Sequence, residues 1–233
     1  MDVLTFRAKV PYECGFRKET AVNTHPTYPL PPFTAWTGLI ANALGFAQDV
    51  PLPWEIQLAQ GILQQGSMHQ SLTLIHKRAH PSETRYLYQS TLVSKERIYY
   101  PAYEVMVYTP DTQGFTDIVE CISDPKRPLY LGASDDLVEI YDIKIDSAIP
   151  VKSSTFHSIV PFELGKMLTE ARVVQLPVRY EYQPDVLHRE LFYFMPQVET
   201  VGNKIPDQPT TIELDRPIEG YQVKDRVVQF VSC

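Results

Sequence analysis

The sequence has few cysteines, half as many glycines as prolines, and no long apolar run. Only Cys14, Cys121 and Cys233 occur in its 233 residues, about a hundred residues apart, which excludes a disulfide framework and a CxxC pair. No apolar run approaches the roughly 18 residues of a membrane span, and the start MDVLTFRAKV lacks the features of a signal peptide. We therefore expect a soluble, cytoplasmic protein with reduced thiols and no membrane contact.

Common catalytic motifs are also missing. The sequence contains no P-loop, GxGxxG, GxSxG or HExxH pattern, which excludes the commonest enzyme classes. Among six histidines, only His76 and His80 have i,i+4 spacing, and in a predicted strand that spacing does not bring two imidazoles together. We expect neither a metal site nor a cofactor.

A shortage of positive charge argues against a free-standing nucleic-acid binder, because the formal net charge is -7. The basic residues are nevertheless concentrated in one segment, 76–97, where five of them stand against two acids: Lys77, Arg78, Arg85, Lys95 and Arg97. With Tyr86 and Tyr88, this segment offers the phosphate contacts and stacking faces that single-stranded RNA requires. A solvated hairpin is the alternative. Residues 105–146 are acidic, with nine acids and three bases.

The pattern of apolar residues predicts an α+β fold. Alternation over residues 3–10 predicts a strand, and the prolines of 11–32 predict an irregular loop. A helix follows with Thr34 as N-cap and Gly45 at its end, and a second is expected over 53–63. The later elements are a strand near 71–79, a strand near 98–109, a helix over 115–124 and two strands over 129–145.

This order is that of a ferredoxin-like (RRM-like) unit. We therefore expect residues 1–147 to form such a domain, with a thumb hairpin inserted at about 76–97. Short strands separated by Pro, Asn and Gly turns predict a smaller β-rich part over 148–233.

The loop before the first helix is a second candidate RNA site. Arg17 and Lys18, together with Tyr28, precede a helix start at which Thr34, Trp36 and Thr37 lie, and the free N–H groups there would attract an anion. The alternative is an ordinary capped helix with Trp36 in the core. Catalysis is also conceivable, with His76 as a base on the 2′-hydroxyl, Lys77 opposite the phosphorane charge and Tyr86 nearby.

Three segments are similar to motifs of one known family. THPTYPLPPFTAWTGLIANALG resembles the Y-P-x-P-P and A-L-G segment of the fifth CRISPR-associated (Cas) family, PKRPLYLGASDDLVEI resembles its P-L-Y-L-G-x-S strand, and ERIYYPAYEVMVY its P-x-Y-x-V strand. The matches occur in family order over residues 3 to about 140. Ala133 stands where relatives often have a basic residue after the LYLG glycine, which argues against a phosphate contact at this position.

The resemblance implies a RAMP protein that caps the 5′ handle of CRISPR RNA (crRNA) in a type I Cascade complex. Its partners would be the backbone subunit, reached through the thumb, the large subunit, and target DNA near the PAM. Such a complex acts in antiviral defence or RNA-guided transposition. The YPLPP helix entry is more similar to the non-catalytic I-B-like branch than to the I-C branch, whose members cut precursor RNA with a Tyr and a Lys–His pair.

Two alternatives remain open at this point. In the first, the chain is a metal-independent endoribonuclease that uses His76, Lys77 and Tyr86, although the His76–Lys77 pair has the reverse of the family order. In the second, the chain is a scaffolding protein with a solvated basic hairpin.

Overall fold

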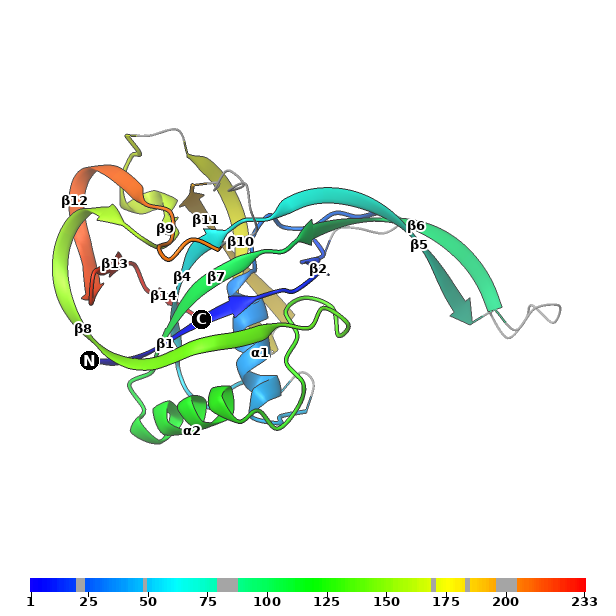
Figure 1. The fold of residues 1–233 in the computed structure, drawn as a ribbon, viewed down its shortest axis with the longest axis horizontal. Helices are drawn as coiled ribbons and strands as arrows, with labels where there is room; N and C mark the ends of the chain where they lie inside the picture. Colours follow the sequence, from blue (N-terminus) through cyan, green and yellow to red (C-terminus); the bar gives the residue numbers. More distant parts are fainter. Residues whose placement is uncertain (20–23, 48–49, 79–87, 169–170, 183–184, 196–204) are drawn as a thin grey trace.

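The computed structural model describes the chain except residues 20–23, 48–49, 79–87, 169–170, 183–184 and 196–204, with the backbone alone at 76–78, 88–89 and 182. The fold is mostly β, with two α-helices, α1 and α2, that lie on one side of a long curved sheet (Figure 1). This confirms the expected α+β class.

Four antiparallel strands form the centre of the large sheet, in the order β8-β1-β7-β4. Helix α1 connects β1 to β4, and α2 connects β7 to β8, so these elements follow one another as strand, helix, strand, strand, helix and strand. The second strand of this order was expected near 71–79, but it is β4, and residues 71–78 belong to another strand, β5 (Ser67–Arg78). The bounds are β1 Asp2–Lys9, α1 Phe33–Ala43, β4 Gln57–Gln64, β7 Ala102–Tyr108, α2 Thr112–Ser123 and β8 Glu139–Phe156.

The helix expected over 53–63 is wrong, because β4 occupies most of that segment. Trp54, Leu58 and Ile62 have helical spacing, but residues 58–63 are all buried, which is the pattern of a strand covered on both faces. A short apolar run does not distinguish a buried strand from a buried helix by its periodicity.

C-terminal strands extend this sheet at both edges. The order is β13-β12-β8-β1-β7-β4-β14, with β12 Ile212–Val223, β13 Arg226–Val228 and β14 Val231–Ser232. Strand β8 pairs with β1 through its first half and with β12 through its second half, so it runs through the expected boundary at residue 147. The division into two parts stays a prediction.

A second sheet has the order β10-β11-β9, with β9 Val160–Pro161, β10 Arg172–Tyr182 and β11 Asp185–Phe194. A 3-10 turn, Phe162–Leu164, follows β9. This sheet packs on α1, where the ring centroids of Phe33 and Phe192 are 5.2 Å apart. Helix α1 therefore lies between the two sheets, and one core unites them.

The N-cap predicted at Thr34 is wrong, because α1 begins at Phe33 and its N-cap is Pro32. The Pro31–Pro32 pair holds the backbone extended up to that point, and helical dihedral angles start at Phe33, two residues earlier than expected. Gly45 is confirmed at the end of the helix, with φ +80, a conformation that glycine adopts without strain.

The three cysteines are unpaired, and Cys14 and Cys121 are buried. Burial raises the pKa of Cys14 well above its usual value and that of Cys121 to about 12. Because the thiolate is the reactive form, neither side chain is a nucleophile at neutral pH.

His157 gives the fold a pH dependence. Its Nδ1 accepts a hydrogen bond from the Val227 N–H (3.1 Å), and burial, followed by the nearby charge of Arg226, lowers the pKa of the imidazole. An unfolded chain binds this proton more readily, so the stabilisation is complete above about pH 6.5 and is lost as the pH falls toward the folded-state pKa.

We expect His157→Asn, whose amide oxygen can replace Nδ1 as the acceptor, to lose less stability than the unmodified chain between pH 8 and pH 5.5. Urea unfolding midpoints at the two pH values measure the difference. Equal losses in both proteins would show that His157 does not contribute.

Candidate functional site

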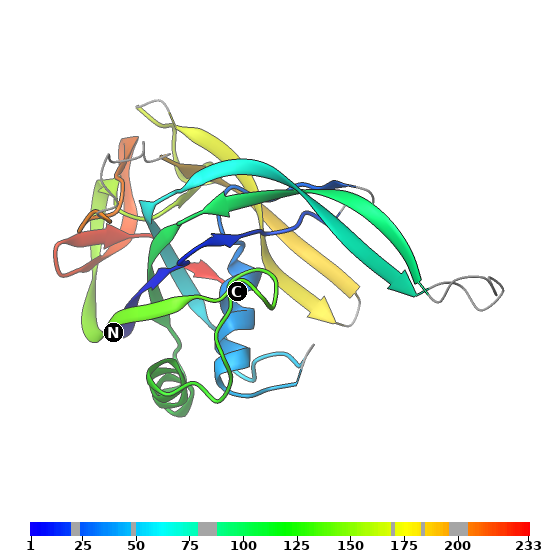
Figure 2. The ribbon, with the colours of Figure 1, turned by 45° about the vertical axis from the view of Figure 1, so that its right-hand side comes forward.

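A long two-stranded arm projects from the body of the molecule (Figures 1 and 2). Strands β5 (Ser67–Arg78) and β6 (Tyr88–Tyr99) pair without a bulge from Ser67–Tyr99 to Arg78–Tyr88. The arm is longer than the hairpin expected at about 76–97, because β5 already begins at Ser67 and β6 continues to Tyr99. It carries Lys77, Arg78, Lys95 and Arg97.

One face of the arm is an exposed apolar stripe, defined as Met68, Leu72, Leu74 and Leu92. Leu72 is 69% exposed, and Leu74 lies directly opposite Leu92. Alternation along a strand places Met68, Leu72 and Leu74 on the same face. Contiguous exposed apolar side chains are typical of a surface that contacts another molecule.

Arg97, on the other face of β6, was expected to bind phosphate, but its charge is already paired. The guanidinium forms a bidentate contact with Asp136 and lies 3.2 Å from a Glu13 carboxylate oxygen. Asp136 is 1% exposed and also accepts hydrogen bonds from the N–H groups of Gly15 and Ala133, each 3.0 Å. Arg97 therefore fixes the loop at 132–136 to the root of the arm.

The segment with Arg17 and Lys18 lies beside the root of the arm. It connects β2 (Glu13–Cys14), antiparallel to β6, with β3 (Thr24–His25), parallel to β6. The Thr27 N–H donates to Glu96 of β6 (2.9 Å). Arg17 is exposed and Lys18 half-buried. The structure thus places these two candidate RNA residues between two strands that pair with β6, the strand that carries Lys95.

Tyr28, expected as a stacking residue, is buried beneath Lys18, whose Nζ lies 5.5 Å from the ring centroid. Its hydroxyl donates to Glu19 (3.0 Å), and burial, followed by the hydrogen bond to Glu19, raises its pKa. Arg189 of β11 pairs with the same carboxylate at 3.3 Å. Tyr28 therefore supports Lys18 and gives no open face to a base.

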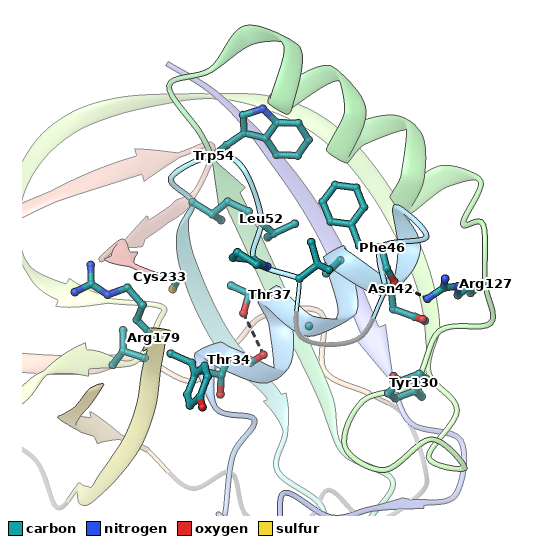
Figure 3. A pocket seen from close by; sticks show the side chains of 18 residues that line it. Thr34, Thr37, Asn42, Phe46, Leu52, Trp54, Arg127, Tyr130, Arg179 and Cys233 are labelled. Carbon is teal, nitrogen blue, oxygen red and sulfur yellow. Dashed lines mark hydrogen bonds between the residues drawn. The ribbon is translucent and has the colours of Figure 1, made fainter. Parts of the chain in front are cut away.

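Thr34 and Thr37 line a pocket of about 460 Å³ between α1, the 46–56 segment and β10 (Figure 3). Phe46, Leu52 and Trp54 form its apolar side, and Arg127 and Arg179 also line it. The Thr37 hydroxyl donates to the Thr34 carbonyl (3.1 Å). A volume of this size suits a small ligand or one protruding side chain.

Trp36 does not reach this pocket, because it points into the core and is 1% exposed. Its Nε1 donates to Gln60 Oε1 (2.8 Å), and its ring meets Phe6 and Tyr103 edge-on. Its burial favours the alternative, a helix with Trp36 in the core, over a direct contact with RNA. The start of α1 is not an open anion site either, because Pro31, Pro32 and Phe33 are all buried.

The remaining candidates cannot be placed. Arg85 and Tyr86 lie outside the described residues, and His76, Lys77 and Arg78 are described only by their backbone. The nuclease hypothesis stays a prediction. Within the described ranges, no three His, Cys, Asp or Glu side chains gather as metal ligands, and no described helix is long and apolar enough to cross a bilayer.

Aromatic residues at the root of the arm were not among the candidates. Tyr12, Tyr99 and Tyr100 are exposed, and His69 stacks on Tyr99. The sequence signal was the IYYP run that follows the basic segment, which we interpreted only as part of a strand.

Comparison with known proteins supplies a family. A family model described as "CRISPR-associated protein (Cas_Cas5)" matches residues 3–195. A CRISPR protein from Archaeoglobus fulgidus has a similar fold, with a TM-score of 0.57 and 11% identity over 100% of both chains. A chain of a CRISPR RNA-guided surveillance complex has a TM-score of 0.49 and 14% identity, over 94% of this chain and 91% of the other. No curated protein sequence matches. Because the family model covers most of its length, the chain belongs to the Cas5 family of CRISPR-associated proteins.

Proposed function

We propose that this chain is a non-catalytic, cytoplasmic subunit of a type I Cascade complex that binds the 5′ handle of crRNA, in antiviral defence or RNA-guided transposition. Membership of the Cas5 family over residues 3–195 is the observation that carries this proposal. The strand order β8-β1-β7-β4, with α1 and α2 in the connections between strands, supports a ferredoxin-like fold for the N-terminal part. The YPLPP helix entry favours an I-B-like subtype.

The RNA would follow the root of the arm. Arg17 and Lys18 lie in the segment between β2 and β3, the two strands that pair with β6, and β6 carries Lys95, so we assign the phosphate contacts to these three cations. Arg97 is left out, because Glu13 and Asp136 neutralise it. Lys77 and Arg78 belong to β5 and would continue the path along the arm, whereas Arg85 lies outside the described residues and stays a candidate from the sequence. Thr34 and Thr37 would contact a nucleotide only in the pocket beside α1 that they line.

The apolar stripe supports a protein partner. Its four side chains are more than half exposed, on the face of the arm opposite to Lys95. We assign the stripe to the contact with the neighbouring backbone subunit, and the acidic surface of residues 105–146 to the large subunit. Contact with target DNA near the PAM remains an expectation.

The test is a gel shift of handle RNA against a scrambled RNA, run beside an incubation of 5′-labelled repeat RNA in EDTA. We expect selective binding of the handle and no cutting. Arg17→Ala combined with Lys18→Ala should weaken binding and lower the salt slope by roughly one for each phosphate that the protein no longer neutralises. Lys144→Ala with Lys152→Ala is the matched control, because both lysines are exposed on β8, away from the arm (Figure 1).

Three outcomes would contradict this proposal. Site-specific cutting in EDTA that is abolished in His76→Ala or Lys77→Ala would indicate the endoribonuclease. Non-specific binding that disappears at moderate salt would indicate a scaffold with a solvated hairpin. If both double variants change the slope equally, Arg17 and Lys18 are not in the RNA site.

A further inference from the structure

Three aromatic rings form a stack at the root of the arm, which we call the ring ladder: His69, Tyr99 and Tyr100. The rings of His69 and Tyr99 are parallel within 2°, with centroids 3.6 Å apart, and Tyr100 follows at 6.0 Å and 30°. Tyr99 of β6 is paired with Ser67 of β5 and with Glu13 of β2, so the ring ladder lies where these three strands meet. The ladder is therefore held by three strands.

The last ring of the ladder is carried by an unfavourable backbone. Tyr100 has φ +52, in the left-handed region where Gly and Asn are favoured and a bulky residue is an outlier. Hydrogen bonds fix this conformation on both sides, because its N–H donates to the Tyr12 carbonyl (2.8 Å) and its carbonyl accepts from Gln64 Nε2 (2.8 Å). Such conformations are concentrated at binding and catalytic sites.

Packing does not account for a tyrosine here. The Tyr100 side chain is 51% exposed, and Tyr12, whose carbonyl holds the Tyr100 N–H, is 74% exposed. The left-handed backbone disfavours a tyrosine at position 100, and the exposed ring adds little to the core. Contact with a ligand is a better explanation for a tyrosine at this position. An exposed, rigid aromatic face is the feature on which unpaired bases stack.

The charges around the ladder are suited to a nucleic acid strand. Glu13, the acid next to His69 and Tyr99, lies 3.2 Å from His69 Nε2 and 3.2 Å from Arg97 Nε, and since Arg97 is shared with Asp136 it offsets the charge of Glu13 only in part. Alternation along β6 places Lys95 on the same face as Tyr99. Lys95 and Tyr99 are four positions apart along the strand, a distance of about 13 Å. An RNA strand whose base stacks on the ring ladder can therefore place a phosphate near Lys95.

We propose that the ring ladder binds an unpaired nucleobase of single-stranded RNA by stacking on the outer face of Tyr100. This deepens the proposed function and rests on it, because it assigns a base-binding position to an RNA path that so far has only phosphate contacts. Stacking reads the π-face of the base and not its hydrogen-bonding edge, so this position accepts any of the four bases.

The experiment compares Tyr100→Gly with Tyr100→Phe in the full chain. Glycine removes the ring but adopts the observed φ without strain, so we expect the Tm to be unchanged or higher. Phenylalanine keeps the ring. The probe is a short handle RNA that contains 2-aminopurine at one position at a time, with affinity measured by titration and stacking by quenching of the fluorophore.

We expect Tyr100→Gly to bind RNA about 5- to 150-fold more weakly and to abolish quenching at one position, while Tyr100→Phe stays close to the unmodified chain. If the unmodified chain binds RNA and Tyr100→Gly binds it equally well with the same quenching, the ladder is not an RNA site and is better assigned to a protein contact. If the unmodified chain binds no RNA at all, the proposed function fails together with this inference.

Discussion

Replacing Asp136 by alanine is expected to lower the free energy of unfolding by about 3–5 kcal/mol, because it removes one partner of a buried ion pair. The carboxylate is enclosed and is the acceptor for Arg97 and for two backbone N–H groups, those of Gly15 and Ala133. Without it, the half-buried guanidinium keeps only its contacts with Glu13, and the two backbone donors lose this acceptor. Urea unfolding, followed by circular dichroism, measures the change.

The adjacent Asp135 is the matched control, because it is exposed and its replacement by alanine removes the same charge. We expect Asp135→Ala to change stability by no more than about 0.5 kcal/mol. A double-mutant cycle with Arg97→Ala should show strong coupling between Arg97 and Asp136. If Asp136→Ala is as mild as Asp135→Ala, the loop at 132–136 does not depend on this ion pair.

This ion pair also shows why the function of Arg97 could not be predicted from the sequence. Arg97 and Asp136 are far apart in the chain, and the basic segment and the acidic segment each suggested an external partner. The fold brings these two oppositely charged residues together at the root of the arm. A charge count along the sequence identifies a basic hairpin but does not show which of its charges are neutralised within the molecule.

A structural feature that depends on a few neighbouring residues could be predicted from the sequence. The end of α1 at Gly45 follows from a conformation that glycine favours. The start of α1 and the strand β4 were not predicted correctly. The start of α1 is determined by the Pro31–Pro32 pair rather than by the capping preference of Thr34. The segment of β4 is a strand because it is buried on both faces, although its apolar residues have helical spacing. Thr34, which we expected at the cap of the helix, lies inside α1 and lines the pocket beside it.

The ring ladder was missed for a related reason. Tyr99 and Tyr100 stand near the start of an aromatic and β-branched run, which is the composition of an ordinary strand. Only the left-handed backbone at Tyr100 and the stack with His69, thirty residues earlier in the sequence, distinguish them from core residues. Neither feature has a sequence signature, because tyrosine is not a residue that a positive φ predicts.

Trp36→Ala is the second large effect, with an expected decrease of about 3–5 kcal/mol in the free energy of unfolding. The indole fills the space between Phe6 and Tyr103, and its N–H is the partner of the buried Gln60 oxygen. Its removal leaves both a cavity and an unpaired acceptor. Trp54→Ala is the matched control, since that indole is only half-buried at the wall of the α1 pocket and should cost less.

Trp36→Phe separates the core role of this residue from the RNA contact that the sequence suggested. Phenylalanine keeps an aromatic ring in the core but cannot donate to Gln60, so we expect a smaller decrease in stability and an unchanged affinity for handle RNA. The affinity is measured under conditions where both proteins are folded. A clear decrease in RNA affinity in a stably folded Trp36→Phe protein would mean that Trp36 acts at the RNA site, and that the α1 start opens when RNA binds.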